Sequence, residues 1–148
     1  MKVRIKKLNP HAVTPKYATE GSAGFDLVAV EDVKIEPGHT SLVKTGLSVE
    51  IPKGYELQVR PRSGNSLKTK MRVANSPGTV DSDFRGEVCV IVDNLAAYFP
   101  PNGGTLEIKK GDKIAQGVIC PIIQAEFEEV EDLSSTARGS GGFGSTGK

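Results

Sequence analysis

Short runs in which every second residue is apolar, each ended by glycine or proline, restrict the fold of this chain more than any other feature of its sequence. Leu47, Val49 and Ile51 alternate with polar residues before the turn at 52–54. The same pattern occurs in segments 33–36, 55–59 and 106–109. A period of two is typical of a strand with one buried face, whereas a helix repeats about every 3.6 residues. Many short strands between regular turns predict an all-β sandwich or barrel.

Two further apolar segments, 88–92 and 114–123, are rich in β-branched side chains and are expected to be buried strands. One short helix is expected at 66–71. The side chain of Asn65 or Ser66 can accept a hydrogen bond from a free N–H group at its first turn. The sequence therefore predicts a β domain with a single helical turn or two.

Length, charge and cysteine content exclude several classes of protein. A chain of 148 residues fits one domain that can bury a core without disulfides. Its formal net charge of +1 does not favour a nucleic-acid or membrane partner. Cys89 and Cys120 are far apart and are expected to be reduced thiols. We predict no signal peptide, because no apolar run follows the basic residues 1–10, and we expect a cytoplasmic location, or the nucleus or a host cytoplasm for a eukaryotic or viral source.

Residues 134–148 differ in composition from the β domain predicted for 1–133. They are rich in serine and glycine and follow an acidic segment at 126–132. Such a composition cannot offset its own ordering entropy by burial, so it predicts a flexible arm, either a loose tail or a segment that orders over a ligand. Residues 142–148 have the spacing of a P-loop, but no helix follows them, and we do not interpret them as one.

Segment 62–66 is the first candidate for anion binding. Gly64 lets a ligand approach the backbone, and the hydroxyl groups of Ser63 and Ser66 suit phosphate oxygens. Arg62 adds a permanently charged donor that can bind two oxygens at once. An ordinary capped turn with a surface arginine has the same composition, so this segment alone does not decide between the two.

Carboxylate and amide side chains next to apolar strands are the other candidates. Residues 74–87 are expected to form a long hairpin, whose backbone can read the polar edge of a flat base. Within it, Asp81 is expected to be a partly buried carboxylate that can hold and polarise water. Asp26 can bind a hard cation through water or accept hydrogen bonds from a turn. Gln116 either satisfies buried backbone groups or faces a ligand.

In this order, these segments resemble the five signature segments of the homotrimeric dUTPase (deoxyuridine 5'-triphosphate nucleotidohydrolase) family. The matching segments are 22–27, 61–66, 75–87, 111–116 and 138–147. The resemblance implies a jelly-roll-like β fold and a homotrimer in which three chains share each site. It also implies Mg²⁺-assisted, in-line attack of water on the α-phosphate of dUTP, giving dUMP for dTTP synthesis and pyrophosphate and keeping uracil out of DNA.

The resemblance further implies roles for single residues. Asp81 would orient the attacking water, and Asp26 would contact hydrated Mg²⁺. Uracil would be bound by Asn75, Gly78, Thr79, Val80 and the backbone of Cys89. The phosphates would be bound by Arg62, Ser63, Gly64, Ser66 and Gln116. From the arm, Arg138 would pair with the γ-phosphate, Phe143 would stack on uracil, and the remaining contacts would come from Gly144, Ser145 and Thr146.

One position departs from the family pattern, because Phe84 stands where the third segment usually has tyrosine. The ring is expected under the deoxyribose, where it leaves no room for a 2′-hydroxyl, but the phenol hydrogen bond is lost. Three alternatives stay open at this point. They are a dCTP deaminase of the same fold, a dUTPase-fold binding or regulatory protein, and a structural jelly-roll subunit, which would need neither Asp81 nor Arg138.

Overall fold

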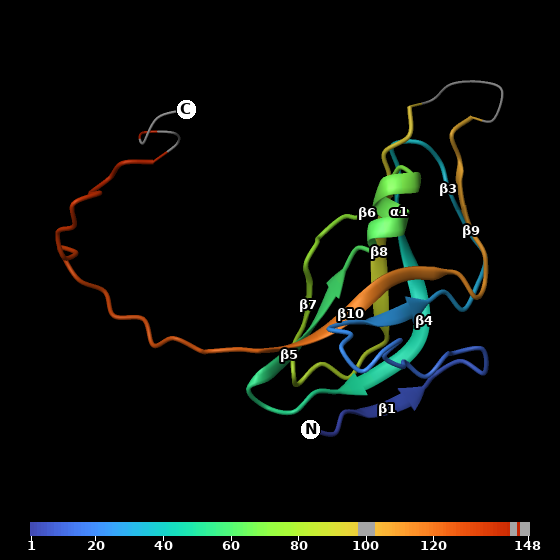
Figure 1. Ribbon diagram of the computed structural model, residues 1–148, viewed down its shortest axis with the longest axis horizontal. Coiled ribbons are helices and arrows are strands. Elements are labelled where there is room, and N and C mark those ends of the chain that lie inside the picture. Colours follow the sequence, from blue (N-terminus) through green and yellow to red (C-terminus); the bar gives the residue numbers. More distant parts are fainter. Residues whose placement is uncertain (98–102, 143–144, 146–148) are drawn as a thin grey trace.

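The computed structural model describes residues 1–97, 103–142 and 145, and this part of the chain folds into two packed sheets and a small third one (Figure 1). The first sheet has the order β1 (Arg4–Lys7), β4 (Thr40–Glu50), β8 (Val88–Asn94) and β6 (Met71–Val73). The second has the order β2 (Phe25–Val28), β10 (Lys113–Pro121), β5 (Tyr55–Arg60) and β7 (Gly78–Val80). The third pairs β3 (Val33–Ile35) with β9 (Leu106–Ile108). The all-β, jelly-roll-like prediction is confirmed.

The core lies between the inner faces of the two larger sheets. Val43, Val90 and Val92 are fully buried there. In β8 every second residue is buried and the residues between them are half-buried, so the segment predicted as a buried strand is buried on one face only. The uniformly apolar sequence of 88–92 does not show this alternation, which follows from the pleat of the strand because successive side chains point to opposite faces.

Strand β4 is kinked where the pairing with β8 shifts between Lys44 and Leu47. At the kink Gly46 has a φ of 67°, a conformation that favours glycine. A Cβ atom there would lie 2.8 Å from Cβ of Asn9 and 2.9 Å from Cβ of Ala12. The kink is therefore built into the packing of β4 against the N-terminal segment.

The helix begins and ends earlier than the sequence analysis expected. Helix α1 spans Ser63–Lys68, and Arg62 is its extended N-cap residue without a side-chain capping bond. The amide of Asn65 donates instead to the carbonyl oxygen of Lys113, at 3.0 Å. Met71, expected in the helix, is buried in β6, where it pairs with Asn94. Sheet pairing and burial of Met71 outweigh the local capping signal.

The hairpin predicted for 74–87 is present, and it also crosses between the sheets. Its flanking strands, β6 and β8, are antiparallel neighbours in the first sheet. Within it, β7 leaves that sheet and pairs with β5 at the edge of the second. The segment thus links the two sheets at one side of the barrel.

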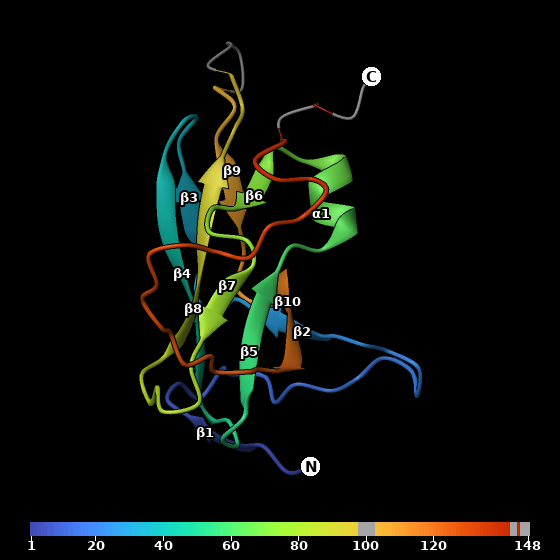
Figure 2. The same ribbon diagram turned by 90° about the vertical axis from the view of Figure 1, so that its left-hand side faces the viewer.

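After β10, residues 122–142 form neither helix nor strand, and they run away from the body of the molecule. Figures 1 and 2 show this segment, in orange and red, leaving the barrel and curving through space beside it. The domain boundary predicted at 133/134 stays a prediction. Within the described residues, no helix is long and apolar enough to span a membrane.

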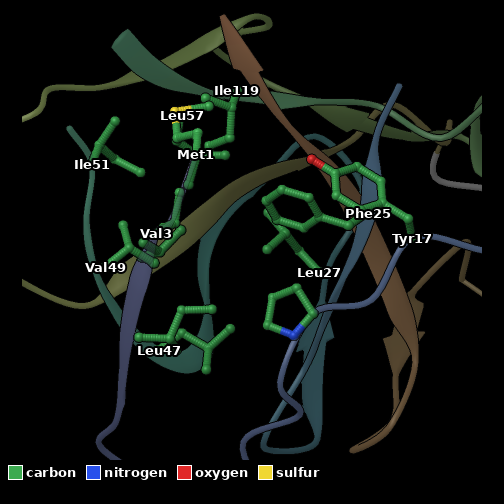
Figure 3. Close-up of a pocket in the computed structure, with 13 residues that line it drawn as sticks. Met1, Val3, Tyr17, Phe25, Leu27, Leu47, Val49, Ile51, Leu57 and Ile119 are labelled. Carbon is green, nitrogen blue, oxygen red and sulfur yellow. The ribbon is translucent and has the colours of Figure 1, made fainter. Parts of the chain in front are cut away.

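An apolar cavity of about 220 Å³ lies between the sheets near the N-terminus (Figure 3). It is lined by Met1, Val3, Ile5, Pro15, Tyr17, Phe25, Leu27, Leu47, Val49, Ile51, Leu57, Val88 and Ile119. The rings of Tyr17 and Phe25 meet edge to face there, with centroids 5.7 Å apart. None of the predicted site residues that the structure describes lines this cavity, so the candidate site lies elsewhere.

Candidate active site

Outward-facing residues of the second sheet build a polar cavity beside the start of α1. Gln116 of β10 pairs with Asp26 of β2 on one side and with Arg60 of β5 on the other. Residues directly opposite one another share a face, so these side chains lie outside the barrel, while Leu27 and Ala115 next to them are buried inside. The cavity, of about 320 Å³, is lined by Lys16, Ala18, Gly24, Asp26, Arg62, Ser63, Gly64, Lys113 and Gln116.

Asp26 is held between two cations in this polar cavity. Its Oδ1 lies 2.8 Å from Nε of Arg62, and its Oδ2 lies 2.7 Å from Nζ of Lys113. Burial raises the pKa of the Asp26 carboxyl, but the hydrogen bond from Lys113 and the charges of both cations outweigh it and leave the pKa below its usual range. The ionised carboxylate therefore fixes two positive groups on the wall of the cavity.

Lys113 is a site residue to which the sequence analysis gave no role. The pairing of β10 with β2 shifts between Lys113 and Ala115, so Ile114 and Ala115 are both buried although they are consecutive. This bulge brings Lys113 to the same outer face as Gln116. A strict period of two would have placed the two side chains on opposite faces.

Gln116 makes a hydrogen bond to the backbone and also lines the polar cavity, and its contact with a ligand stays a prediction. Its Nε2 donates to the carbonyl oxygen of Pro61 at 2.9 Å, which ties β10 to the segment that enters α1. The same side chain lines the polar cavity. Ser63 and Gly64 are exposed at its edge, whereas Ser66, half-buried, is not among the lining residues. The predicted phosphate-binding residues of the barrel, other than Ser66, thus meet in one place, together with Asp26.

A second cavity, of about 290 Å³, lies at the side of the barrel where β7 crosses between the sheets. The residues of the barrel predicted to bind uracil or the sugar all line it: Asn75, Gly78, Thr79, Val80, Asp81, Phe84 and Cys89. Leu42, Val59, Glu87, Val88 and Ile91 complete the wall. Because β7 is the edge strand of its sheet in the described part of the chain, the backbone groups along its outer edge are open to a ligand.

The turn that follows β7 carries Asp81 and Phe84. The Phe84 N–H donates to the carbonyl oxygen of Asp81 at 3.2 Å. Asp81 is exposed, so the expectation of a partly buried carboxylate is wrong for the single chain. The reason is that β7 is short and lies at an edge, and the residue after it reaches solvent. Phe84 is 43% exposed, and its ring lies against Gly86.

Cys89 and Cys120 are free cysteines, and both are half-buried. Burial raises the pKa of the Cys89 thiol, and the negative charge of Glu87 adds to this effect. The thiol of Cys89 is therefore protonated at neutral pH and is not an activated nucleophile. Its predicted contribution to the second cavity is through the backbone.

The described arm residues line neither cavity of their own chain. Arg138 is exposed, and its Nε donates to the carbonyl oxygen of Gly141 at 2.9 Å. Ser145 is exposed as well. Phe143, Gly144 and Thr146 lie outside the described residues. The part of the chain that the structure describes contains no group of three or more His, Cys, Asp or Glu side chains arranged to hold a metal ion.

These features suit a β-barrel protein for an anionic ligand with a flat ring, because one cavity presents three cationic side chains and a serine hydroxyl and the other a strand edge and an aromatic ring. Comparison with known proteins narrows this class. The dUTPase family model matches residues 11–147, and the chain belongs to the dUTPase family. It is a hydrolase that splits dUTP into dUMP and pyrophosphate, which decides against the deaminase and structural alternatives.

Individual relatives agree with this placement. The deoxyuridine 5'-triphosphate nucleotidohydrolase of Nautilia profundicola is 54% identical over 148 residues, 100% of both chains. The dUTPase of Staphylococcus bacteriophage 80alpha, solved with dUpNHpp, has a TM-score of 0.91 at 30% identity and covers 99% of each chain. A mutant dUTPase of S. aureus phage phi11, described as coordinating a structural Mg(II) ion, has a TM-score of 0.81 at 28% identity over 89% of this chain and 98% of that one.

Proposed function

We propose that the two cavities are parts of one composite dUTP site, completed between chains of a homotrimer. The observation that carries this is that the two cavities are built by different parts of the barrel. The polar cavity lies on β2, β10 and the start of α1, whereas the second cavity lies mainly on β4, β7, β8 and the turn after β7. Among the described residues, none lines both cavities. Each cavity alone offers groups for only one part of a nucleotide, and in this proposal neighbouring chains supply the two halves.

The polar cavity binds the triphosphate in this proposal. Arg62 offers a planar guanidinium that can bind two phosphate oxygens, and Lys113 adds a second charge. Ser63, Gly64 and Gln116 add hydroxyl, backbone and amide donors. The ion pairs with Asp26 keep both cations in place before the substrate arrives, so less ordering is required on binding.

Mg²⁺ fits the donor set of this cavity. The ion usually keeps several waters and binds through one or two carboxylates together with substrate phosphates. Asp26 is the carboxylate among the residues that line the cavity. Asp26 would hold the ion through water, and the bound ion would neutralise charge on the phosphates.

The second cavity binds the base and the sugar. The open edge of β7 at Gly78–Val80 offers N–H and C=O groups to the edge of uracil. Cytosine is rejected, because its exchanged donors and acceptors would leave buried polar groups unpaired. Phe84 lies under the deoxyribose and occupies the space of a 2′-hydroxyl. Asp81, at the end of β7, holds the water that attacks the α-phosphorus.

The arm of a third chain closes the site. Residues 122–142 run away from their own barrel, which suits a segment that acts on a neighbour (Figures 1 and 2). Arg138 then pairs with the γ-phosphate, Phe143 stacks on uracil, and Gly144, Ser145 and Thr146 add contacts. Closure excludes water other than the nucleophile and completes the charge neutralisation.

Complementation between inactive variants tests the shared site. Arg62→Ala and Asp81→Ala each remove one half, so each homogeneous protein is expected to be inactive with dUTP and Mg²⁺. If neighbouring chains combine their halves, co-refolding the two variants restores intact sites and measurable pyrophosphate release. An inactive mixture that has formed mixed oligomers, shown by mass spectrometry of tagged chains, would place the whole site within one chain and refute the proposal.

A further inference from the structure

The kink of β4 is bonded to the loop that carries Phe84 by three contacts in close succession. The Thr45 hydroxyl donates to the carbonyl oxygen of Val88. The Gly46 N–H donates to Oε1 of Glu87 at 2.7 Å, and the Ser48 hydroxyl donates to the carbonyl oxygen of Arg85 at 2.8 Å. Residues 45–48 of β4 thus bind Arg85 and Glu87 at the end of the loop and Val88 at the start of β8.

This stretch is a rigid support. Thr45 is fully buried and Ser48 is 7% exposed, so both hydroxyl groups are removed from water and satisfied by the loop. Gly46 is fixed by its φ of 67° and by the close packing of Asn9 and Ala12 described above. Its N–H points at Glu87 because the kink turns the backbone out of the regular ladder.

Contacts within the loop connect the residues bonded to β4 with the ring and the backbone of Phe84. The ring of Phe84 lies against Gly86, so close that a Cβ atom on residue 86 would be 2.5 Å from Cζ of the ring. Gly86 lies between Arg85 and Glu87, the two residues that the kink holds. The Arg85 guanidinium donates to the carbonyl oxygens of Ser82, at 2.7 Å, and Phe84, at 2.9 Å. The position of the ring therefore depends on the bonds from β4.

We propose that Glu87 is a positioning residue for Phe84 and thereby sets the discrimination between deoxyribose and ribose. Its carboxylate accepts the Gly46 N–H and fixes the backbone under the ring, and it lines the same cavity. It acts through Phe84 and not on the phosphates. This inference rests on the proposed function, in which Phe84 lies under the sugar.

The test compares kcat/KM for dUTP with kcat/KM for UTP. We expect Glu87→Ala to lower this ratio by about tenfold, because small displacements of a positioning group carry large kinetic effects. The loss should lie mainly in KM for dUTP. Glu87→Gln keeps an oxygen that can accept the Gly46 N–H and should restore the wild-type ratio. Ser48→Ala removes one of the other contacts and should lower the ratio by a smaller factor.

Thr40→Val is the matched control. The Thr40 hydroxyl donates to Oδ1 of Asp93 at 2.6 Å and joins the same two strands, β4 and β8, at their other end. This variant should lower the melting temperature slightly and leave the ratio unchanged. A wild-type ratio in Glu87→Ala, or in Ser48→Ala if the former does not fold, overturns the inference. A loss in Glu87→Gln as large as in Glu87→Ala also overturns it.

Phe84→Ala separates this inference from the proposed function. If its dUTP to UTP ratio is that of the wild type, Phe84 does not contact the sugar and the proposed function fails at this point. If Phe84→Ala lowers the ratio and Glu87→Ala does not, Phe84 keeps its role and only the positioning role of Glu87 is refuted.

Discussion

Replacing Asp26 with asparagine tests whether the carboxylate of Asp26 holds Arg62 and Lys113 in position on the wall of the polar cavity. The change keeps the shape of the side chain but removes its charge, and with it the ionic contacts to Arg62 at 2.8 Å and Lys113 at 2.7 Å. A hydrogen bond to a charged group contributes about 1.5–3 kcal/mol when it is buried. Asp26 and Arg62 are about one-third exposed and Lys113 more so, and screening reduces each contact to about 1 kcal/mol.

Two such contacts give about 2 kcal/mol, and if the order that they impose on the two cations is fully used in the transition state, their loss lowers kcat/KM by about thirtyfold. Steady-state pyrophosphate release at several Mg²⁺ concentrations measures this loss, and we expect the requirement for Mg²⁺ to increase as well. Asp32→Asn is the control, because Asp32 pairs with Lys109 at 3.6 Å on an exposed surface and lines neither cavity. If Asp26→Asn kept kcat/KM within about twofold of the control, the reasoning would be refuted.

Three further predictions concern the remaining parts of the site. Asp81→Asn should lower kcat by about 10²-fold or more, because it removes the group that is proposed to hold the nucleophilic water, while the melting temperature stays that of the wild type; an unchanged kcat would remove Asp81 from the proposed mechanism. Deletion of residues 138–148 should abolish most dUTP turnover and leave the proposed homotrimer intact by light scattering, and normal turnover would show that the arm is dispensable. The pKa of Asp26 is lower in the folded protein, so its ion pairs stabilise the fold above the unfolded pKa of about 3.9, and this contribution disappears as the pH falls through the folded pKa; urea unfolding between pH 7 and pH 3 should show a smaller loss of stability in Asp26→Asn than in the wild type.

Strands with regular alternation could be predicted from the sequence, because burial of one face requires the same pattern that the residues show. Strand β5 is an example, with Leu57 and Val59 both buried. The start of the helix could not be predicted this way. Its N-cap residue, Arg62, makes no side-chain capping bond, and its last expected residue belongs to a strand.

Some residues of the candidate site could likewise be predicted from the sequence, and others could not. The predicted site residues of the barrel, apart from Ser66, line one of the two cavities, and their individual roles stay predictions. Lys113 was missed because a bulge, not the period of two, brings it to the outer face. Glu87 and Thr45 were missed because their contacts join residues far apart in sequence. The exposure of Asp81 follows from its position at an edge, which alternation alone does not reveal.

The register of β10 connects the fold to the site. Gln116 faces outward and its neighbour Gly117 faces inward, where a Cβ atom would lie 2.5 Å from the ring of Phe25 and 2.9 Å from Leu57. A slip of one residue would place the long polar side chain of Gln116 in that space, so the slipped pairing is excluded by packing. Because Gln116 pairs with Asp26, the same restriction fixes the carboxylate that orders the two cations. The buried glycine Gly117 thus determines the position of the face that is proposed to bind the phosphates, although it lines neither cavity.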